Sequence, residues 1–246
     1  MQKVIILGAC SGIAQCVQRE LAANGKEILL VARSPERLSA LKRDLLVRGA
    51  GDVLAFPLDF EETSHHSRLL QFAEEKFSGF DTVLLAYGSM LDQEQCQNSA
   101  ALTIRQLHTD FVSAAALLTL FAEYFEPRKM GCIAVITSVA GDRGRRTNYT
   151  YGAAKGALSL FVQGLRSRLY PAGVRVITIK PGPVDTTMTA SLPKNKPFAD
   201  PRTVGKDIYR ALERQSPEIL YTPFYWRYVM RAVRTIPESV FKRLNF

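Results

Sequence analysis

Short apolar runs, rich in β-branched side chains, recur along the chain between longer stretches of mixed polarity. Runs of this length and composition are typical of strands that are buried on both faces of a sheet. We predict seven such strands, at Val4–Leu7, Ile28–Val31, Val53–Phe56, Thr82–Ala86, Cys132–Thr137, Val174–Ile179 and Ile219–Tyr221.

The intervening stretches have the length and the apolar spacing of helices. Strands that are apolar on both faces need a helix layer on each side, so we expect a doubly wound parallel sheet with right-handed crossovers. Such sheets bind ligands at the carboxyl ends of their strands. The predicted helices are Ile13–Ala23, Glu36–Arg48, Glu62–Phe77, Leu102–Phe125 and Tyr151–Tyr170.

The pattern changes after the sixth predicted strand. Residues Pro183–Pro201 are polar and rich in proline, which predicts a long loop of the kind that often closes over a ligand. Residues Phe224–Ile236 then repeat with a helical period. We therefore divide the chain into a domain at 1–222 and an extension at 223–246. One side of the extension is basic and the other apolar, with Arg227, Arg231 and Arg234 opposite Trp226, Val229, Met230 and Val233.

This amphipathic extension permits two interpretations. Its basic and aromatic side chains fit peripheral contact with an anionic membrane through residues 224–246. Alternatively, its apolar side covers the core of the domain or an interface between subunits. The residue pattern alone favours neither interpretation.

Length and composition agree with one compact α/β domain. The 246 residues are 47% hydrophobic and 22% charged, which excludes a collagen, a long coiled coil and a disordered chain. No apolar run approaches the ~20 residues that a membrane-spanning helix needs. The four cysteines and three histidines lack the spacing of a metal site or a disulfide framework. We therefore expect no metal site and a location in the reducing cytoplasm. If residues 224–246 contact a membrane, we expect the protein to be peripheral on its inner face.

The chain is basic, with 32 basic and 23 acidic side chains and a formal net charge of +9. Such an excess can indicate a nucleic-acid partner. The basic residues are spread over the predicted surface helices, however, and neither a base-stacking motif nor a recognition helix is present. We therefore expect no binding of nucleic acid.

A turn with two glycines, Gly8-Ala9-Cys10-Ser11-Gly12-Ile13, leads from the first predicted strand into the first predicted helix. Glycines at its first and fifth positions let the backbone approach a pyrophosphate, whose charge the helix N-terminus favours. Arg33 follows the second strand, where an acidic residue usually binds the ribose of NAD. An arginine there can pair with a 2′-phosphate, so we expect NADPH rather than NADH. Alternatively, the glycine turn is only a tight connection between strand and helix, and Arg33 is only a solvated side chain.

Tyr151 and Lys155 lie on one face of a predicted helix, and Ser138 ends a predicted strand. The Lys155 ammonium beside the Tyr151 phenol should favour the phenolate and so lower the pKa of the tyrosine. Tyr151 would then donate a proton to a substrate oxygen that the Ser138 hydroxyl holds in place. The same spacing also arises by chance on helices, so the motif gains weight only in combination.

Together these motifs resemble the short-chain dehydrogenase/reductase family over nearly the whole chain. The resemblance implies a Rossmann-like fold, reduction of a keto group by NADPH, and dimers or tetramers formed through the helices of Leu102 and Tyr151. It also implies that Ser138, Tyr151 and Lys155 are catalytic. Its implied cofactor contacts are Gly8, Cys10, Ser11, Gly12, Ile13, Arg33, Asp59, Ala86, Tyr87, Gly88, Tyr151, Lys155, Pro181, Gly182, Val184 and Thr186.

Two positions depart from the family pattern. The family's Asn-Asn-Ala-Gly after the fourth strand is here Leu85-Ala86-Tyr87-Gly88, so the packing at that strand end must differ. The family's helix asparagine, which organises a proton relay, aligns with Asp110, which we therefore include among the catalytic residues. A carboxylate accepts hydrogen bonds but cannot donate those of an amide, so the geometry of the relay or its pH dependence should change.

Residues Ser138–Asn148 and Tyr225–Met230 are similar to a narrower group of the family, the decaprenylphosphoryl-2-keto-ribose reductases of cell-envelope precursor synthesis. This similarity implies a keto-sugar linked to a polyprenyl phosphate as the substrate. Arg143, Arg145 and Arg146 would suit a sugar phosphate at the mouth of the site, unless they form a solvated loop. The alternatives are a small, acyl or steroid-like carbonyl substrate, or a non-catalytic NADP-binding sensor or partner subunit.

Overall fold

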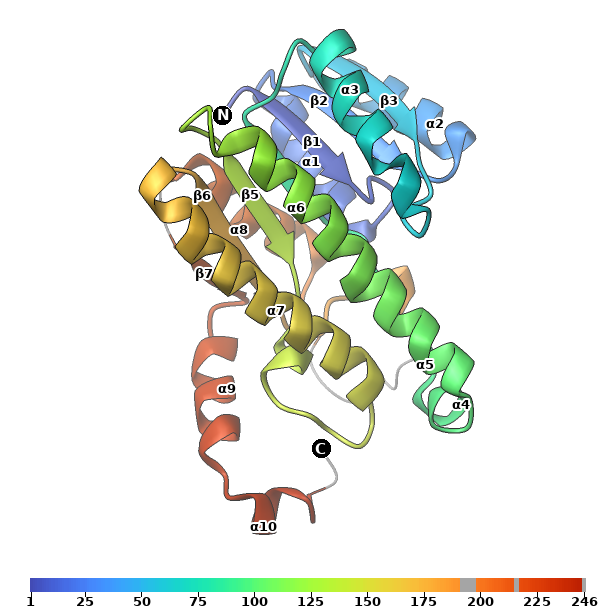
Figure 1. The fold of residues 1–246 in the computed structure, drawn as a ribbon, viewed down its shortest axis with the longest axis vertical. Helices are drawn as coiled ribbons and strands as arrows, with labels where there is room; N and C mark the ends of the chain where they lie inside the picture. Colours follow the sequence, from blue (N-terminus) through green and yellow to red (C-terminus); the bar gives the residue numbers. More distant parts are fainter. Residues whose placement is uncertain (191–197, 215–216, 245–246) are drawn as a thin grey trace.

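The computed structural model describes residues 1–190, 198–214 and 217–244. It contains one parallel sheet of seven strands in the order β3-β2-β1-β4-β5-β6-β7 (Figure 1). The predicted α/β fold and the positions of all seven predicted strands are confirmed. The strands are β1 (Lys3–Leu7), β2 (Glu27–Ala32), β3 (Asp52–Pro57), β4 (Thr82–Leu85), β5 (Cys132–Ile136), β6 (Arg175–Pro181) and β7 (Ile219–Thr222).

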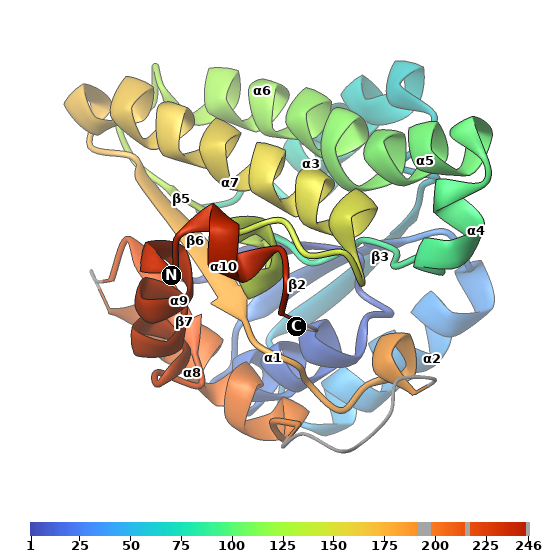
Figure 2. The same ribbon diagram turned by 90° about the horizontal axis from the view of Figure 1, so that it is seen from below.

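Two layers of helices cover the sheet, and each layer encloses its own part of the hydrophobic core (Figure 2). In β1, Ile5 and Leu7 pack toward one layer, whereas Val4 and Ile6 pack toward the other, as the two-residue period of a strand requires. One layer contains α3 (His66–Lys76), α5 (Ala100–Leu107), α6 (Ser113–Phe125) and α7 (Tyr149–Leu169), and the other contains α1 (Gly12–Ala23), α2 (Pro35–Val47) and α8 (Pro201–Glu213).

The order of the strands explains where a ligand can bind. The chain builds outward from β1 to β3, returns to β4 beside β1, and then continues outward to β7. Loops that follow β1 and β4 therefore leave the sheet in opposite directions and open a crevice at the carboxyl ends of these strands. This end of the molecule lies at the bottom of Figure 1.

Three helical features differ from the expectation. Helix α8 was not predicted, although Val204, Ile208 and Leu212 on its buried face follow a helical spacing. The short helix α4 (Gln93–Gln97) was also missed. The single predicted helix Leu102–Phe125 contains a π-helical turn, η2 (His108–Val112), between α5 and α6. Such turns often occur at functional sites, and this one contains Asp110.

The predicted loop Pro183–Pro201 is described in part. In the predicted loop Pro183–Pro201, Val184 and Ala199 form an isolated bridge, and the part at 191–197 lies outside the described residues. No helix in the described part of the chain is long and apolar enough to cross a membrane. Four short single-turn segments complete the described fold. They are η1 (Thr63–His65), η3 (Val139–Asp142), η4 (Tyr170–Ala172) and η5 (Thr187–Thr189).

The C-terminal segment packs against the domain. In α9 (Trp226–Thr235), the side chains of Met230 and Val233 are 0% and 5% exposed and share a small apolar cluster with Val139 of η3. Phe241 of α10 (Glu238–Phe241) completes this cluster. The apolar side of the predicted extension thus covers protein, which is one of the two interpretations that the sequence left open.

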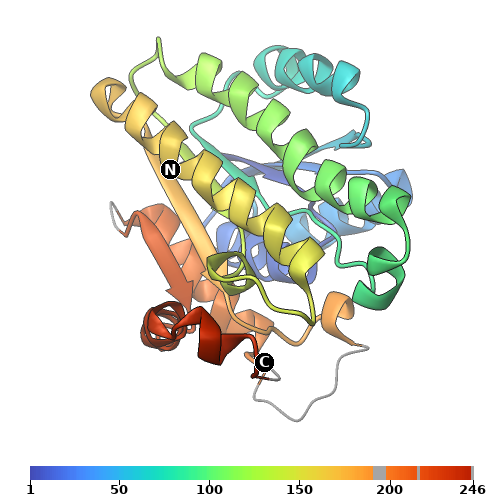
Figure 3. The same cartoon turned by 60° about the horizontal axis from the view of Figure 1, so that its bottom comes forward.

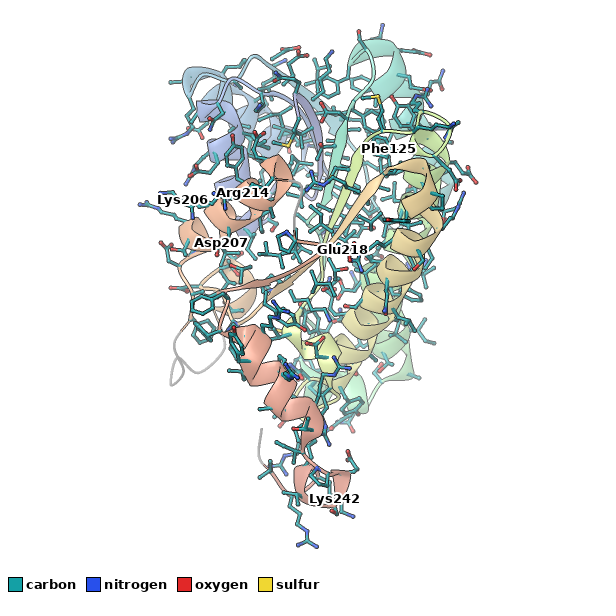
Figure 4. The ribbon with its side chains drawn as sticks, turned by 90° about the vertical axis from the view of Figure 1, so that its left-hand side faces the viewer. Phe125, Lys206, Asp207, Arg214, Glu218 and Lys242 are labelled. Carbon is teal, nitrogen blue, oxygen red and sulfur yellow. The ribbon has the colours of Figure 1, made fainter. Side chains whose placement is uncertain are left out.

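We predict that Gly131, at the start of β5, tolerates no side chain. Its φ is +127°, and a Cβ atom there would overlap the ring of buried Phe125, which Figure 4 labels. Gly131→Ala should lower the free energy of unfolding by about 3 kcal/mol, because it combines backbone strain with overpacking.

Gly164→Ala is the matched control. This glycine lies on the exposed face of α7, and nothing lies within 4 Å of an added Cβ atom. The control should gain up to about 1 kcal/mol from helix propensity. Urea unfolding followed by circular dichroism measures both variants, and equal stabilities would contradict the packing described for Phe125.

Candidate active site

The glycine turn after β1 forms one wall of a cleft at the carboxyl ends of the strands. Gly8 has a φ of +87°, and a Cβ atom there would lie 2.6 Å from the backbone nitrogen of Tyr87. Its own N–H donates to Val31 O at 2.9 Å, which fixes the turn between β1 and β2. Only glycine fits both the positive φ and the close approach of Tyr87. The turn ends at Gly12, so the N-terminus of α1 faces the cleft.

The cleft consists of two adjoining cavities. The larger one, of about 740 Å³, extends from the glycine turn to Arg33 and Asp59. The smaller one, of about 170 Å³, continues to Ser138, Tyr151 and Lys155. Every cofactor contact expected from the family resemblance lies on the wall of one or both cavities. The structure therefore brings these residues, from all parts of the first 186 positions, into one continuous site.

Ser138, Tyr151 and Lys155 all line the smaller cavity. Ser138 follows β5 and accepts a hydrogen bond from Ala140 N at 3.0 Å, which orients its side chain. Tyr151 and Lys155 lie one turn apart on α7, with Lys155 Nζ 5.8 Å from the centre of the tyrosine ring. The three polar groups thus surround a space where a substrate oxygen could bind.

The charge balance at Tyr151 differs from the expectation. Burial raises the pKa of the Tyr151 phenol, the Asp110 carboxylate raises it further, and Ser138 acts in the opposite direction. The prediction that Tyr151 has a lowered pKa is therefore wrong for this structure. The reason is that burial disfavours the charged phenolate, and the Asp110 carboxylate acts in the same direction. Tyr151 stays protonated and can donate.

Asp110 is that acid, and it lies beneath the cleft rather than on its wall. Its side chain is fully buried, and its Oδ1 atom lies 3.9 Å from Lys155 Nζ. The same oxygen accepts a hydrogen bond from Ser89 N at 2.7 Å, and Oδ2 accepts one from Gln106 Nε2. Burial raises the pKa of this carboxyl, whereas Lys155 and the hydrogen bonds lower it. Asp110 thus links the π-helical turn, the loop after β4 and α7.

Gly88 separates Asp110 from the cleft. A Cβ atom at Gly88 would lie 2.8 Å from both Asp110 Oδ1 and Lys155 Nζ. Glycine is therefore required here for the buried pair to form directly under the cleft floor. This requirement explains why the final glycine of the family's strand-four motif is kept when the rest of the motif changes.

Tyr87 stands where the family motif has alanine and changes the local packing, as the departure from the motif predicts. Its ring stacks on Phe60 with centroids 4.1 Å apart. Its hydroxyl shares a hydrogen bond of 2.9 Å with Ser113 Oγ at the start of α6. Tyr87 therefore fastens the end of β4 to the loop after β3 and to the helix layer.

The three arginines between Ser138 and Tyr151 have different positions. Arg145 lines the smaller cavity, as expected. Arg146 is exposed and does not line either cavity. Arg143 turns away from the site and donates to Val233 O and Ile236 O, both at 2.6 Å. Arg143 therefore does not take the place beside a sugar phosphate that was one of the two interpretations of this cluster, because its guanidinium binds the end of α9.

Arg37 and Asn148 are among the cleft residues that sequence reasoning missed. Arg37, in the first turn of α2, lines the larger cavity and donates to Cys10 O at 3.3 Å. Its position four residues after Arg33 was the available signal. Asn148 lines the smaller cavity just before α7, and no sequence pattern distinguishes it.

Comparison with known proteins agrees with this geometry. The family model described as short chain dehydrogenase matches residues 2–197. An uncharacterized oxidoreductase of Mycobacterium tuberculosis is 32% identical over 98% of this chain and 96% of its own length. Another, from Streptomyces coelicolor, is 31% identical over 99% of this chain and 96% of its own.

Two solved structures show the same fold. A short-chain dehydrogenase from Sphingobium yanoikuyae, in complex with NADPH, has a TM-score of 0.83 at 22% identity and covers 97% of this chain and 98% of its own. One from Burkholderia cenocepacia, in complex with NADP, has a TM-score of 0.84 at 19% identity over the full length of both chains. With its glycine turn and its Ser138, Tyr151 and Lys155 in one cleft, the chain belongs to the short chain dehydrogenase family of oxidoreductases.

Proposed function

We propose that the protein uses NADPH to reduce a keto group to an alcohol. The observation that carries this proposal is the single cleft that joins a phosphate-binding turn to a protonated tyrosine. A dinucleotide and a carbonyl substrate could meet there. The complexes of the Sphingobium and Burkholderia proteins with NADPH and NADP support the choice of cofactor.

The residues of the larger cavity fit NADPH. The missing side chain at Gly8 and the N-terminus of α1 suit a pyrophosphate. At the other end of the cavity, Arg33 and Arg37 would pair with a 2′-phosphate. The wall formed by Pro181, Gly182 and Thr186 would hold the nicotinamide end beside Tyr151. When bound, the cofactor supplies the hydride.

The polar groups of the smaller cavity would complete the reduction. The Ser138 hydroxyl donates a hydrogen bond to the carbonyl oxygen and orients it. As the carbonyl carbon accepts the hydride, Tyr151 transfers its phenolic proton to the same oxygen, which yields the alcohol. Lys155 stabilises the phenolate that remains until solvent restores the proton. Asp110 holds the Lys155 ammonium in position from below.

For the substrate, we propose a keto-sugar linked to a polyprenyl phosphate in cell-envelope precursor synthesis. The likeness of residues 138–148 and 225–230 to the reductases of such substrates supports this choice. Arg145 adds a cationic group to the wall near Tyr151, where a sugar phosphate would be recognised. A small, acyl or steroid-like ketone is the alternative substrate. Comparing the rates with linked sugars, free sugars and simple ketones distinguishes the two.

The first prediction concerns the proton donor. Tyr151→Phe should lower kcat for ketone reduction by about 10²–10⁴-fold, because the substituted ring has no proton to donate. The affinity for NADPH should be unchanged. Loss of NADPH absorbance gives the rate, with a polyprenyl-phosphate-linked keto-pentose, its free sugar and simple ketones as substrates.

Tyr149→Phe is the control for this prediction. Tyr149 lies on the same helix but is 43% exposed and does not line the smaller cavity. Its replacement should leave the rate intact. If wild-type protein bound NADPH but turned over no carbonyl, the reductase proposal would fail and a sensor or partner subunit would take its place.

The second prediction concerns the cofactor. Arg33→Ser combined with Arg37→Ser should weaken NADPH binding at least about 10-fold, because two charge-assisted hydrogen bonds to the 2′-phosphate are lost. NADH, which lacks this phosphate, should bind as before. Arg43→Ser, on the exposed face of α2, is the control. Fluorescence titration measures both affinities, and an equal loss for NADH would contradict the assigned role.

The third prediction concerns pH. Asp110 raises the pKa of Tyr151, so Asp110→Asn should lower it. The rate of reduction requires protonated Tyr151 and falls as pH rises through this pKa. The alkaline limb of the pH–rate profile should therefore move to lower pH in the variant, and alcohol oxidation should begin at lower pH as well.

Asp44→Asn, an acid on α2 far from the site, should leave the profile unchanged. A profile that did not move in Asp110→Asn would remove Asp110 from the electrostatics of the site. An intact unfolding transition distinguishes this result from a general loss of structure.

A further inference from the structure

The face of α9 that points away from the domain combines aromatic and basic side chains. Phe224, just before the helix, is 74% exposed and Tyr228 is 66% exposed. At 100° per residue, these two side chains and that of Arg231 fall on the side away from buried Met230 and Val233, and exposed Arg227 lies at the edge of that side. Together with exposed Val240, Lys242, Arg243 and Leu244, they form what we term the outer face.

The outer face is not the apolar side that the sequence pattern drew attention to. That side is covered by η3 and by the residues around β7. The exposed aromatic side chains are therefore not part of the cluster that packs the tail against the domain. Exposed rings and aliphatic chains among arginines and lysines are characteristic of segments that lie in the interface of a membrane.

Charge favours an anionic surface. Residues 224–244 contain five basic side chains, all exposed, and one acidic side chain, Glu238. Glu238 is already paired with Arg143 at 3.0 Å. None of the five basic side chains forms a salt bridge to another residue in the described ranges. Their positive charge is therefore available to a partner.

A second copy of the chain fits this face poorly. In a two-fold symmetric dimer the same patch meets itself, so the five basic side chains would oppose their own equivalents. An anionic lipid surface offers the complementary charge together with an apolar region for Phe224 and Tyr228.

The C-terminal segment that carries the outer face is fastened to segments that border the cleft. Arg143 donates to Val233 O and Ile236 O and stacks 3.8 Å from the ring of Phe241. Trp226 lies against Gly182, where a Cβ atom would overlap the indole ring. Both Arg143 and Gly182 belong to segments that border the smaller cavity. Contact made by the tail would therefore hold the cleft at a fixed orientation.

The tail and the cleft also share one end of the molecule. Helices α9 and α10 lie beyond the carboxyl ends of the strands, at the bottom of Figure 1, and this end is turned toward the viewer in Figure 3. Lys242 projects from the far end of the tail (Figure 4). From exposure, charge and attachment, we propose that the outer face docks on an anionic membrane surface and presents the cleft near it.

The test is co-sedimentation of the full chain with vesicles of phosphatidylcholine, with or without phosphatidylglycerol. Wild-type protein should bind the anionic vesicles and be released by high salt. Arg227→Glu with Arg231→Glu should weaken binding at least about 10-fold, because each arginine near the surface contributes to attraction. Phe224→Ser with Tyr228→Ser should weaken binding at low salt although the net charge is unchanged, since it removes the apolar contact.

The matched control carries the same change in net charge elsewhere. Arg19→Glu with Arg43→Glu alters exposed positions on α1 and α2 and should bind nearly as well as wild type. NADPH affinity and thermal unfolding, measured on every variant, identify any that fail to fold.

Three results would overturn the proposal. Wild-type protein could ignore anionic vesicles, or the control could lose as much binding as the tail variants. Alternatively, sedimentation equilibrium could show a dimer that Arg227→Glu with Arg231→Glu dissociates, which would assign the outer face to a second copy. None of these readouts depends on turnover, so failure here and failure of the proposed reductase activity remain distinguishable.

Discussion

The site depends on a buried ion pair, Lys155 with Asp110. Taking two charges out of water is costly, and such a pair is tolerated only when hydrogen bonds satisfy its remaining atoms. Here Ser89 N and Gln106 Nε2 donate to the two carboxylate oxygens. Because these partners come from the loop after β4 and from α5, neither segment can move without exposing an unpaired buried charge. Helix α7, the cleft floor and the π-helical turn are therefore held together as one unit.

This unit also determines which proton chemistry is available. A lone ammonium beside Tyr151 would favour the phenolate, which accepts protons. Here burial and the Asp110 carboxylate both raise the pKa of the phenol, which favours its protonated form. The replacement of an amide by Asp110 is thus an electrostatic choice as well as a steric one.

Local patterns predicted most of this structure, because strands and turns are encoded by neighbouring residues. The apolar runs located all seven strands, and the glycines at 8 and 12 located the cleft. What the sequence could not supply depends on distant contacts. The π-helical turn is visible only when α5 and α6 pack, and Arg143 finds its carbonyl partners 90 and 93 residues away. Helix α8 is different, since its apolar spacing was present and a proline-rich start concealed it.

The tail shows why an amphipathic pattern alone is ambiguous. Periodicity reports that one side of a helix seeks an apolar environment, but a domain core and a membrane provide the same environment. The two are separated by what remains exposed after folding. In α9 the periodic apolar side is buried against the domain. Phe224 and Tyr228 stay exposed, beside arginines that form no salt bridge within the described chain. An interaction surface is therefore better sought among residues that packing leaves unused than among those that create the pattern.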